Sequence, residues 1–209
     1  MQKRLKDFYL QLLATYGHQK WWPAQTPYEV MIGAVLTQNT NWKNVEKAIA
    51  NLKAADCISP RAVLDMRSAR LEALIRPSGF YRQKAERLKL ATEKWSELVQ
   101  NPKRKTHHSR FDTIALRNEW LSVKGIGKET ADSILLYAFE RPIFVVDAYT
   151  RLFCAHHRLF EAEEYDEYRN FFESNIPRSV PLFKEYHALI VEWAKENKRK
   201  IRTVVKPKS

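Results

Sequence analysis

The chain is poor in cysteine, with only Cys57 and Cys154 among 209 residues. Two cysteines are too few for a disulfide framework, and they exclude a four-cysteine iron–sulfur cluster held within this chain. The longest apolar runs, MIGAVL and IFVV, fall far short of the ~20 residues that a membrane-spanning helix needs. The first residues, MQKRLKDFYLQLL, do not resemble a secretory signal with its cleavage site. We therefore expect a protein of the reducing cytoplasm that does not enter a membrane.

Motifs for metals and nucleotides are also missing. Four of the six histidines form the adjacent pairs His107-His108 and His156-His157, and adjacent residues point to different sides of a helix. The sequence has no Cys/His spacing typical of zinc and no Gly-rich loop followed by Lys-Ser or Lys-Thr. We expect no metal, no cofactor and no nucleotide hydrolysis.

Basic residues are abundant: 36 Lys and Arg against 24 Asp and Glu give a formal charge of +12. A polyanion such as nucleic acid is the first candidate partner, although basic surfaces also serve solubility or anionic membranes. Seven basic residues against Glu196 alone fall within 195–209, which suits either phosphate contact or a solvated tail. Charge alone leaves these alternatives open.

The apolar residues recur at spacings of three and four almost throughout, which predicts an all-α fold. Thr26-Pro27 and Ser59-Pro60 place a capping oxygen before a proline, a signature of helix starts. The predicted helices span residues 4–16, 27–36, 42–54, 60–65, 69–75, 82–98, 112–123, 129–139, 148–156, 165–174 and 180–197. The stretch NPKRKTHHSR is the one clear basic linker.

The segment NEWLSVKGIGKETADSILLYAF predicts two helices joined by a glycine-containing turn. We expect both glycines to adopt backbone angles closed to other residues, and the intervening isoleucine to anchor the turn. Backbone N–H groups at the start of the second helix, together with the lysines, would then bind a phosphate. The alternative is a tight turn that serves only backbone geometry. The predicted phosphate-binding hairpin comprises Lys124, Gly125, Ile126, Gly127, Lys128 and Thr130.

An acid, Asp147, follows the apolar run of residues 143–146 and opens the next predicted helix. Aspartate is a favoured N-cap, and capping alone, at ~1 kcal/mol, would explain it. The alternative is a functional role for an acid that ends a buried segment. The residues alone leave both roles open.

The hairpin, the spacer and VVDAYTRLF together resemble the endonuclease III superfamily of DNA glycosylases. With WWP, AVLTQNT, RPSGFYRQKAERL, KGIGKETADSIL and HALIVEWAK, nearly the whole chain is similar to the bacterial 3-methyladenine DNA glycosylase III branch. The resemblance implies two helical lobes with an active-site cleft between them. One lobe, 27–141, would be a six-helix barrel-like unit with the helix-hairpin-helix, and 1–26 with 142–209 would form the other. The protein would act as a monomer on double-stranded DNA that contains a damaged base.

The resemblance also assigns catalytic roles. Asp147 would stabilise the oxocarbenium-like sugar and help water to attack it. Bifunctional members carry a nucleophilic lysine where this chain has Glu129, which implies a monofunctional enzyme. Lys128 lies about 100° away around a helix and should face elsewhere. Glu129 would line the base pocket, or would simply be a first-turn acid favoured by the helix dipole.

The remaining site residues would hold and expose the base. Trp22 and Trp42 would sandwich it, with Trp21 and Pro23 beside them, whereas Trp95, Trp120 and Trp193 are expected in the core. Lys195 would point toward the active site or lie on the surface. Gln38 would fill the gap left by the flipped base, and Phe80 would wedge into the stack or pack against the core. Arg82 and Lys84 would contact phosphates or lie exposed.

The expected function is a monofunctional DNA glycosylase that excises alkylated purines such as 3-methyladenine in base excision repair. One alternative is a bifunctional glycosylase and lyase for oxidised or mismatched bases. The other is a non-catalytic DNA-binding module built on the hairpin, for which Asp147 is only a cap.

Overall fold

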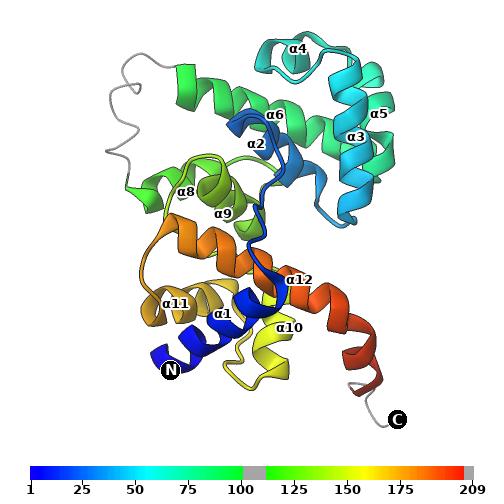
Figure 1. Cartoon of the computed structure of the whole chain (residues 1–209). Helices are drawn as coiled ribbons and strands as arrows, with labels where there is room; N and C mark the ends of the chain where they lie inside the picture. Colours follow the sequence, from blue (N-terminus) through cyan, green and yellow to red (C-terminus); the bar gives the residue numbers. More distant parts are fainter. Residues whose placement is uncertain (101–111, 205–209) are drawn as a thin grey trace. The chain divides into compact units, whose positions relative to one another are not determined.

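The computed structural model describes residues 1–100 and 112–204, with side chains described for 1–99 and 112–197. The predicted linker NPKRKTHHSR, with its His107-His108 pair, lies outside the described residues, as do most side chains of the basic tail. Within the described part every regular element is helical, which confirms the all-α prediction (Figure 1). None of these helices has the length and apolar composition needed to cross a membrane.

The elements follow one another as α1 (Gln2–Tyr16), α2 (Pro27–Leu36), α3 (Trp42–Ala54), α4 (Pro60–Asp65), α5 (Ser68–Ile75), the 3₁₀ helix η1 (Arg76–Ser78), α6 (Tyr81–Gln100), α8 (Thr113–Leu121), α9 (Lys128–Tyr137), α10 (Ala148–His156), α11 (Tyr165–Asn175) and α12 (Val180–Val204). The sequence did not predict η1. It also placed the start of α9 one residue late, because Gly127, a residue with no capping side chain, is the N-cap.

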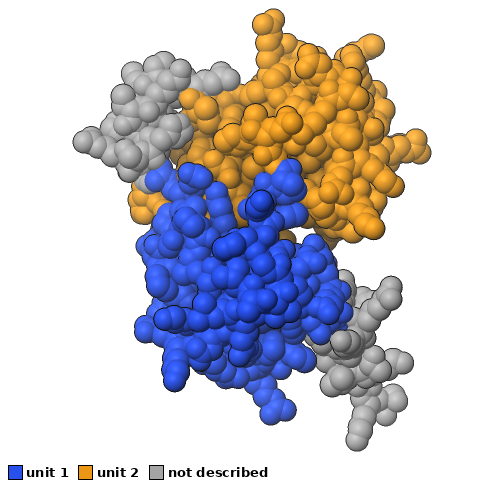
Figure 2. Space-filling view, viewed as in Figure 1, with its two compact units in different colours: residues 1–23, 140–209 blue, residues 24–139 orange. Residues whose placement is uncertain are grey.

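The chain divides into two compact units (Figure 2). Unit 1 comprises Met1–Pro23 with Glu140–Ser209, and unit 2 comprises Ala24–Phe139. The corresponding boundaries predicted from the sequence are residues 27 and 141.

Unit 2 is built around α2, whose residues from Tyr28 to Leu36 are all buried. This helix packs against α3, α6 and α9. The predicted start signals are confirmed: the Thr26 hydroxyl accepts a hydrogen bond from the Glu29 N–H at 3.1 Å, and Ser59 caps α4 in the same way. Because α2 is buried on every side, the chain that leaves its C-terminal end is held in a defined position.

Unit 1 packs α1 and α10 against α12. Its core contains an aromatic cluster in which the rings of Phe144 and Phe172 stack with centroids 4.2 Å apart. Phe144 belongs to the apolar run of residues 143–146, all of them buried. This burial determines where the following residue, Asp147, enters α10.

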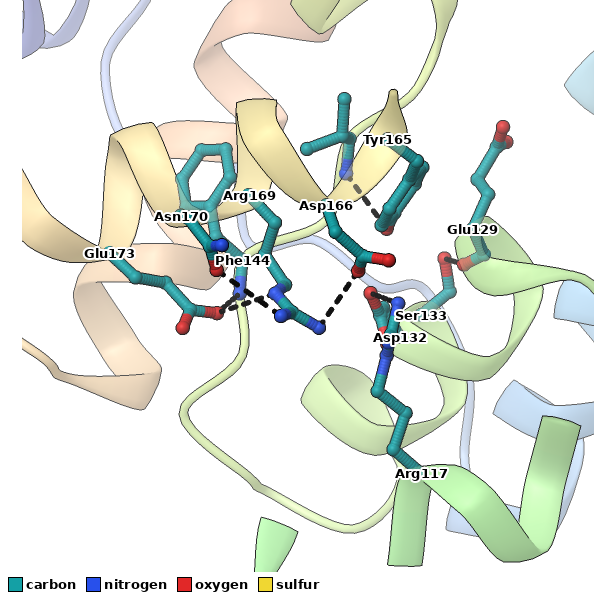
Figure 3. A network of polar contacts seen from close by, with 11 residues as sticks. Arg117, Glu129, Asp132, Ser133, Phe144, Tyr165, Asp166, Arg169, Asn170 and Glu173 are labelled. Carbon is teal, nitrogen blue, oxygen red and sulfur yellow. Dashed lines mark hydrogen bonds and ion pairs between the residues drawn. The ribbon is translucent and has the colours of Figure 1, made fainter. Parts of the chain in front are cut away.

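Two hydrogen bonds to α11 secure the backbone of that run (Figure 3). The Phe144 N–H donates to Glu173 Oε1 at 2.9 Å, and the Val146 N–H donates to the Tyr165 hydroxyl at 3.2 Å. Arg169 lies 3.8 Å from the same Glu173 oxygen and 3.1 Å from Asp166 Oδ1. Two N–H donors of the buried extended segment therefore have the partners that buried backbone requires.

Candidate active site and DNA-binding hairpin

The turn between α8 and α9 is anchored by Ile126, which is 5% exposed and whose N–H donates to the Val123 carbonyl at 3.0 Å. Gly125 has φ +84°, in the region that favours glycine, as the sequence analysis expects. Gly127 has φ −90° and ψ 177°, an extended conformation open to any residue. The prediction of an unusual backbone angle is therefore wrong for Gly127.

The two glycines also differ in their surroundings. A Cβ on Gly125 would lie 2.5–2.7 Å from the side chain of Arg87, whereas one on Gly127 would meet no atom within 4 Å. As the N-cap of α9, Gly127 places no side chain at the N-terminus of the helix, which suits the approach of an anion. Gly125 is thus required by the packing, and Gly127 only keeps the helix end open.

We expect Gly125→Ala to lower the melting temperature by roughly 3–8 °C, because a left-handed alanine costs ~1–2 kcal/mol and Arg87 must also move. The matched variant Gly127→Ala should cost less than ~1 kcal/mol. Thermal unfolding followed by circular dichroism measures both. Equal shifts for the two variants would contradict this reading of the turn.

Two polar side chains of the hairpin, those of Lys124 and Thr130, have partners within unit 2. Lys124 Nζ lies 2.8 Å from Glu86 Oε1, and this hydrogen bond lowers the pKa of Glu86. Both side chains are exposed, so the pair adds little stability. Thr130 is buried, and its hydroxyl oxygen lies 3.1 Å from Gln38 Nε2. Lys128 is half-buried in the first turn of α9.

Asp147 is the N-cap of α10. Its Oδ1 accepts hydrogen bonds from the Thr150 N–H at 2.7 Å and from the Thr150 hydroxyl at 3.0 Å. Its Oδ2 lies 3.4 Å from Nε2 of His187 on α12, and the side chain keeps 15% of its surface exposed. One oxygen is thus used in capping, while the other faces His187.

Burial opposes ionisation of the Asp147 carboxyl, but hydrogen bonds from His187 and Thr150 outweigh it and lower its pKa. The group is therefore a carboxylate at neutral pH. His187, which is 5% exposed, was not singled out from the sequence. The available signal was a polar residue inside the apolar stretch YHALIVEW.

Unit 1 also holds the first tryptophan pair. The rings of Trp21 and Trp22 are tilted by 46° with centroids 5.2 Å apart, in a segment outside any helix. Lys195 Nζ lies 5.9 Å from the Trp21 ring centroid and 3.1 Å from Glu192 Oε2. Pro23 is exposed. Lys195 is held by an exposed ion pair and a cation–π contact of the same unit.

Unit 2 holds the other predicted site residues. Trp42 begins α3 and is half-buried, and Glu129 lies exposed in the first turn of α9. Phe80 is 64% exposed with φ +47°, so the alternative of core packing is wrong. An exposed phenylalanine held in a strained conformation requires a functional explanation.

Gln38 makes two hydrogen bonds to the hairpin and accepts a third from Arg87 on α6. Its Nε2 donates to the Gly125 carbonyl at 3.0 Å and to the Thr130 hydroxyl, and its Oε1 accepts from Arg87 at 2.7 Å. The loop after α2 and the hairpin are therefore joined through one amide. No local pattern indicates this connection, since the partners lie 49 to 92 residues away in the sequence.

The interpretation of Lys84 as a phosphate ligand is wrong, because this side chain is 1% exposed. Its ammonium group is turned inward. Arg82 is exposed, with its guanidinium 6.0 Å from the Tyr81 ring centroid. In the described part of the chain no group of three or more His, Cys, Asp or Glu side chains could hold a metal ion. Cys57 and Cys154 are buried and free.

Comparison with known protein families gives a match over most of the chain. Residues 32–178 match the HhH-GPD superfamily, described as base excision DNA repair proteins. A Methanocaldococcus jannaschii protein named as a candidate DNA repair glycosylase is 52% identical over 190 residues, 90% of this chain and 86% of that protein.

Among solved structures, the H. pylori 3-methyladenine DNA glycosylase MagIII bound to 1,N6-ethenoadenine has a TM-score of 0.75 at 34% identity, covering 94% of this chain and 96% of that one. A trapped endonuclease III–DNA covalent intermediate has the same TM-score at 18% identity, covering 94% of this chain and 87% of that one, and shares the fold. These matches confirm the resemblance found in the sequence. The chain belongs to the HhH-GPD superfamily of base excision DNA repair proteins and is a DNA glycosylase.

Proposed function

We propose that this glycosylase is monofunctional and releases alkylated purines, 3-methyladenine above all, from double-stranded DNA by flipping the base and directing water to the sugar. The observation that carries the proposal is the ionised Asp147 at the start of α10, partly exposed and oriented by Thr150 and His187. A carboxylate in this state stabilises positive charge on the sugar as the base departs.

Glu129 supports a monofunctional reaction. The residue occupies the second position of α9, where the bifunctional enzymes that the sequence resembles have their lysine. A carboxylate cannot form the imine that links those enzymes to the sugar. Water is then the nucleophile. An exposed acid also favours a cationic base over a neutral one.

The chemistry of the substrate fits the aromatic residues. Methylation at N3 leaves adenine cationic, so the glycosidic bond is weakened and little protonation of the leaving group is needed. Flat indole faces stack on such a base and add a cation–π attraction that neutral adenine lacks. Trp22 and Trp42 are the proposed stacking residues, with Trp21, Pro23 and Lys195 beside them. The 34% identity to a 3-methyladenine glycosylase over 94% of this chain supports the same substrate.

Methylated DNA incubated with the full chain is expected to release free 3-methyladenine, detected by chromatography, and to leave abasic sites that break only after added alkali. Borohydride should trap no protein–DNA adduct. Unmethylated DNA is the control for spontaneous loss. Strand breaks without alkali, or a borohydride adduct, would favour the bifunctional alternative. DNA binding without release of any base would favour a non-catalytic binding module.

A further inference from the structure

The buried Lys84 forms a bridge inside unit 2. Its Nζ donates to the Leu36 carbonyl at 2.8 Å and to the Ser78 carbonyl at 2.7 Å, and its side chain is almost wholly removed from solvent. Leu36 is the last residue of α2 and Ser78 is the last residue of η1. One ammonium group thus joins two elements that are 42 residues apart in the sequence.

Both partners are helix ends. The last carbonyls of a helix have no intrahelical donor and carry the negative end of its dipole. An ammonium group between two such ends is stabilised without a carboxylate partner. Burial and the nearby Arg87 lower the pKa of Lys84 to about 8, so the group is charged at neutral pH at an energetic cost. A lysine retained at this cost has a role that an apolar residue would not fulfil.

Each bridged carbonyl belongs to a residue that lies two positions before a residue predicted to insert into the DNA. Gln38 comes two residues after Leu36, and Phe80 comes two residues after Ser78. The Phe80 carbonyl also accepts the Lys84 N–H at 3.0 Å, so the lysine holds this loop through both its backbone and its side chain. Gln38 is additionally bound to the hairpin through the Gly125 carbonyl. The two loops and the hairpin form one connected assembly.

We infer that Lys84 is the positioning residue that holds the Gln38 loop and the Phe80 loop at a set spacing, so that both side chains enter the DNA stack as one unit. Phe80 is exposed and strained before any DNA is bound. Preassembly avoids part of the cost of ordering these loops during base flipping, which itself requires a few kcal/mol. This inference rests on the base flipping of the proposed function, during which Gln38 is predicted to fill the gap and Phe80 to wedge into the stack.

The test measures the fluorescence of a DNA duplex that carries 2-aminopurine beside a tetrahydrofuran abasic analogue. The fluorescence of 2-aminopurine rises when the base unstacks, so insertion of a side chain into the stack is detected directly. At saturating protein, judged by anisotropy, we expect Lys84→Met to give less than one third of the wild-type fluorescence rise. Phe80→Ala should reduce the fluorescence rise to a similar extent. The double variant Lys84→Met with Phe80→Ala should give the same rise as Phe80→Ala alone. Such non-additivity marks two residues that act as one unit.

Lys89 provides a matched control on the same helix. Its Nζ donates to the Leu64 and Met66 carbonyls at 3.4 and 2.6 Å, away from both inserting loops. Lys89→Met should therefore lose stability but keep the full fluorescence rise. Lys84→Gln is measured beside Lys84→Met, so that a folded variant is tested even if Lys84→Met does not fold. Its shorter side chain can bond only one of the two carbonyls, so its fluorescence rise should lie between that of the wild type and one third of it.

The outcomes separate the two proposals. A wild-type protein that binds the duplex without any fluorescence rise would overturn the insertion step, and the role of Lys84 with it. A wild-type rise that persists in every folded Lys84 variant would overturn the positioning role alone. An equal loss in Lys89→Met would also overturn it, because the effect would then follow from general destabilisation of α6.

Discussion

Asp147→Asn is expected to slow base release by about 10²- to 10³-fold while leaving the affinity for DNA within about twofold, because it removes one fixed charge from the site of the reaction. The fold should survive. Asparagine caps helices about as well as aspartate, and its oxygen can still accept the Thr150 N–H that Oδ1 accepts at 2.7 Å. The change therefore removes the charge and keeps the shape.

Single-turnover release of 3-methyladenine measures the rate, and anisotropy on a duplex with a stable abasic analogue measures binding. Asp112 offers a matched control: it is also an aspartate N-cap, and its Oδ1 accepts the Ile114 N–H at 3.3 Å at the start of α8. Asp112→Asn should change neither quantity. Undiminished release by a folded Asp147→Asn protein would leave the residue as a cap only and would remove the basis of the proposed reaction.

Local patterns were sufficient to predict most of the fold. The spacing of apolar residues and the Thr26-Pro27 and Ser59-Pro60 pairs gave α2 and α4 with their observed bounds. The burial of Ile126 was also predicted, because it is the one apolar residue between two glycines in a helical hairpin. These features depend on neighbours within one or two turns, which a sequence displays directly.

Most of the features that the sequence did not predict depend on distant partners. Lys84 has the appearance of a surface residue on a basic helix, and only the approach of two helix ends shows that it is buried. His187 lies 40 residues after the carboxylate that it faces. Gly127 was misjudged for a different reason: two glycines in one turn suggest one backbone role, yet only Gly125 has a positive φ. The burial of a lysine and the pairing of side chains far apart in the sequence have no local signature.

The ion pair of Arg117 and Asp132 is another long-range feature that the sequence did not predict (Figure 3). Its loss has the largest expected effect on stability. Arg117 Nε lies 2.6 Å from Asp132 Oδ1, and Arg117 Nη2 lies 3.1 Å from Asp132 Oδ2. The two side chains are 8% and 0% exposed. Arg117 is on α8 and Asp132 is on α9, so this bidentate pair joins the two helices of the hairpin.

Asp132→Ala is therefore expected to destabilise the protein by ~3–5 kcal/mol, because it removes the carboxylate that binds a buried guanidinium through two hydrogen bonds. For a chain of this size that corresponds to a fall in melting temperature of roughly 6–20 °C. Arg61→Ala is the matched control. It breaks an ion pair with Asp65 in which both side chains are exposed, 93% and 71%, and should cost less than ~1 kcal/mol.

A double variant distinguishes the loss of the pair from the loss of packing. Arg117→Met with Asp132→Leu removes both charges and keeps apolar volume between α8 and α9, and exchanges of this kind are often close to neutral. We expect it to regain most of the stability that Asp132→Ala loses, as measured by thermal and urea unfolding. If the double variant is as unstable as Asp132→Ala, the hairpin requires the ion pair itself and not merely the absence of an unpaired charge. If Asp132→Ala unfolds like the wild type, the pair does not hold the two helices together.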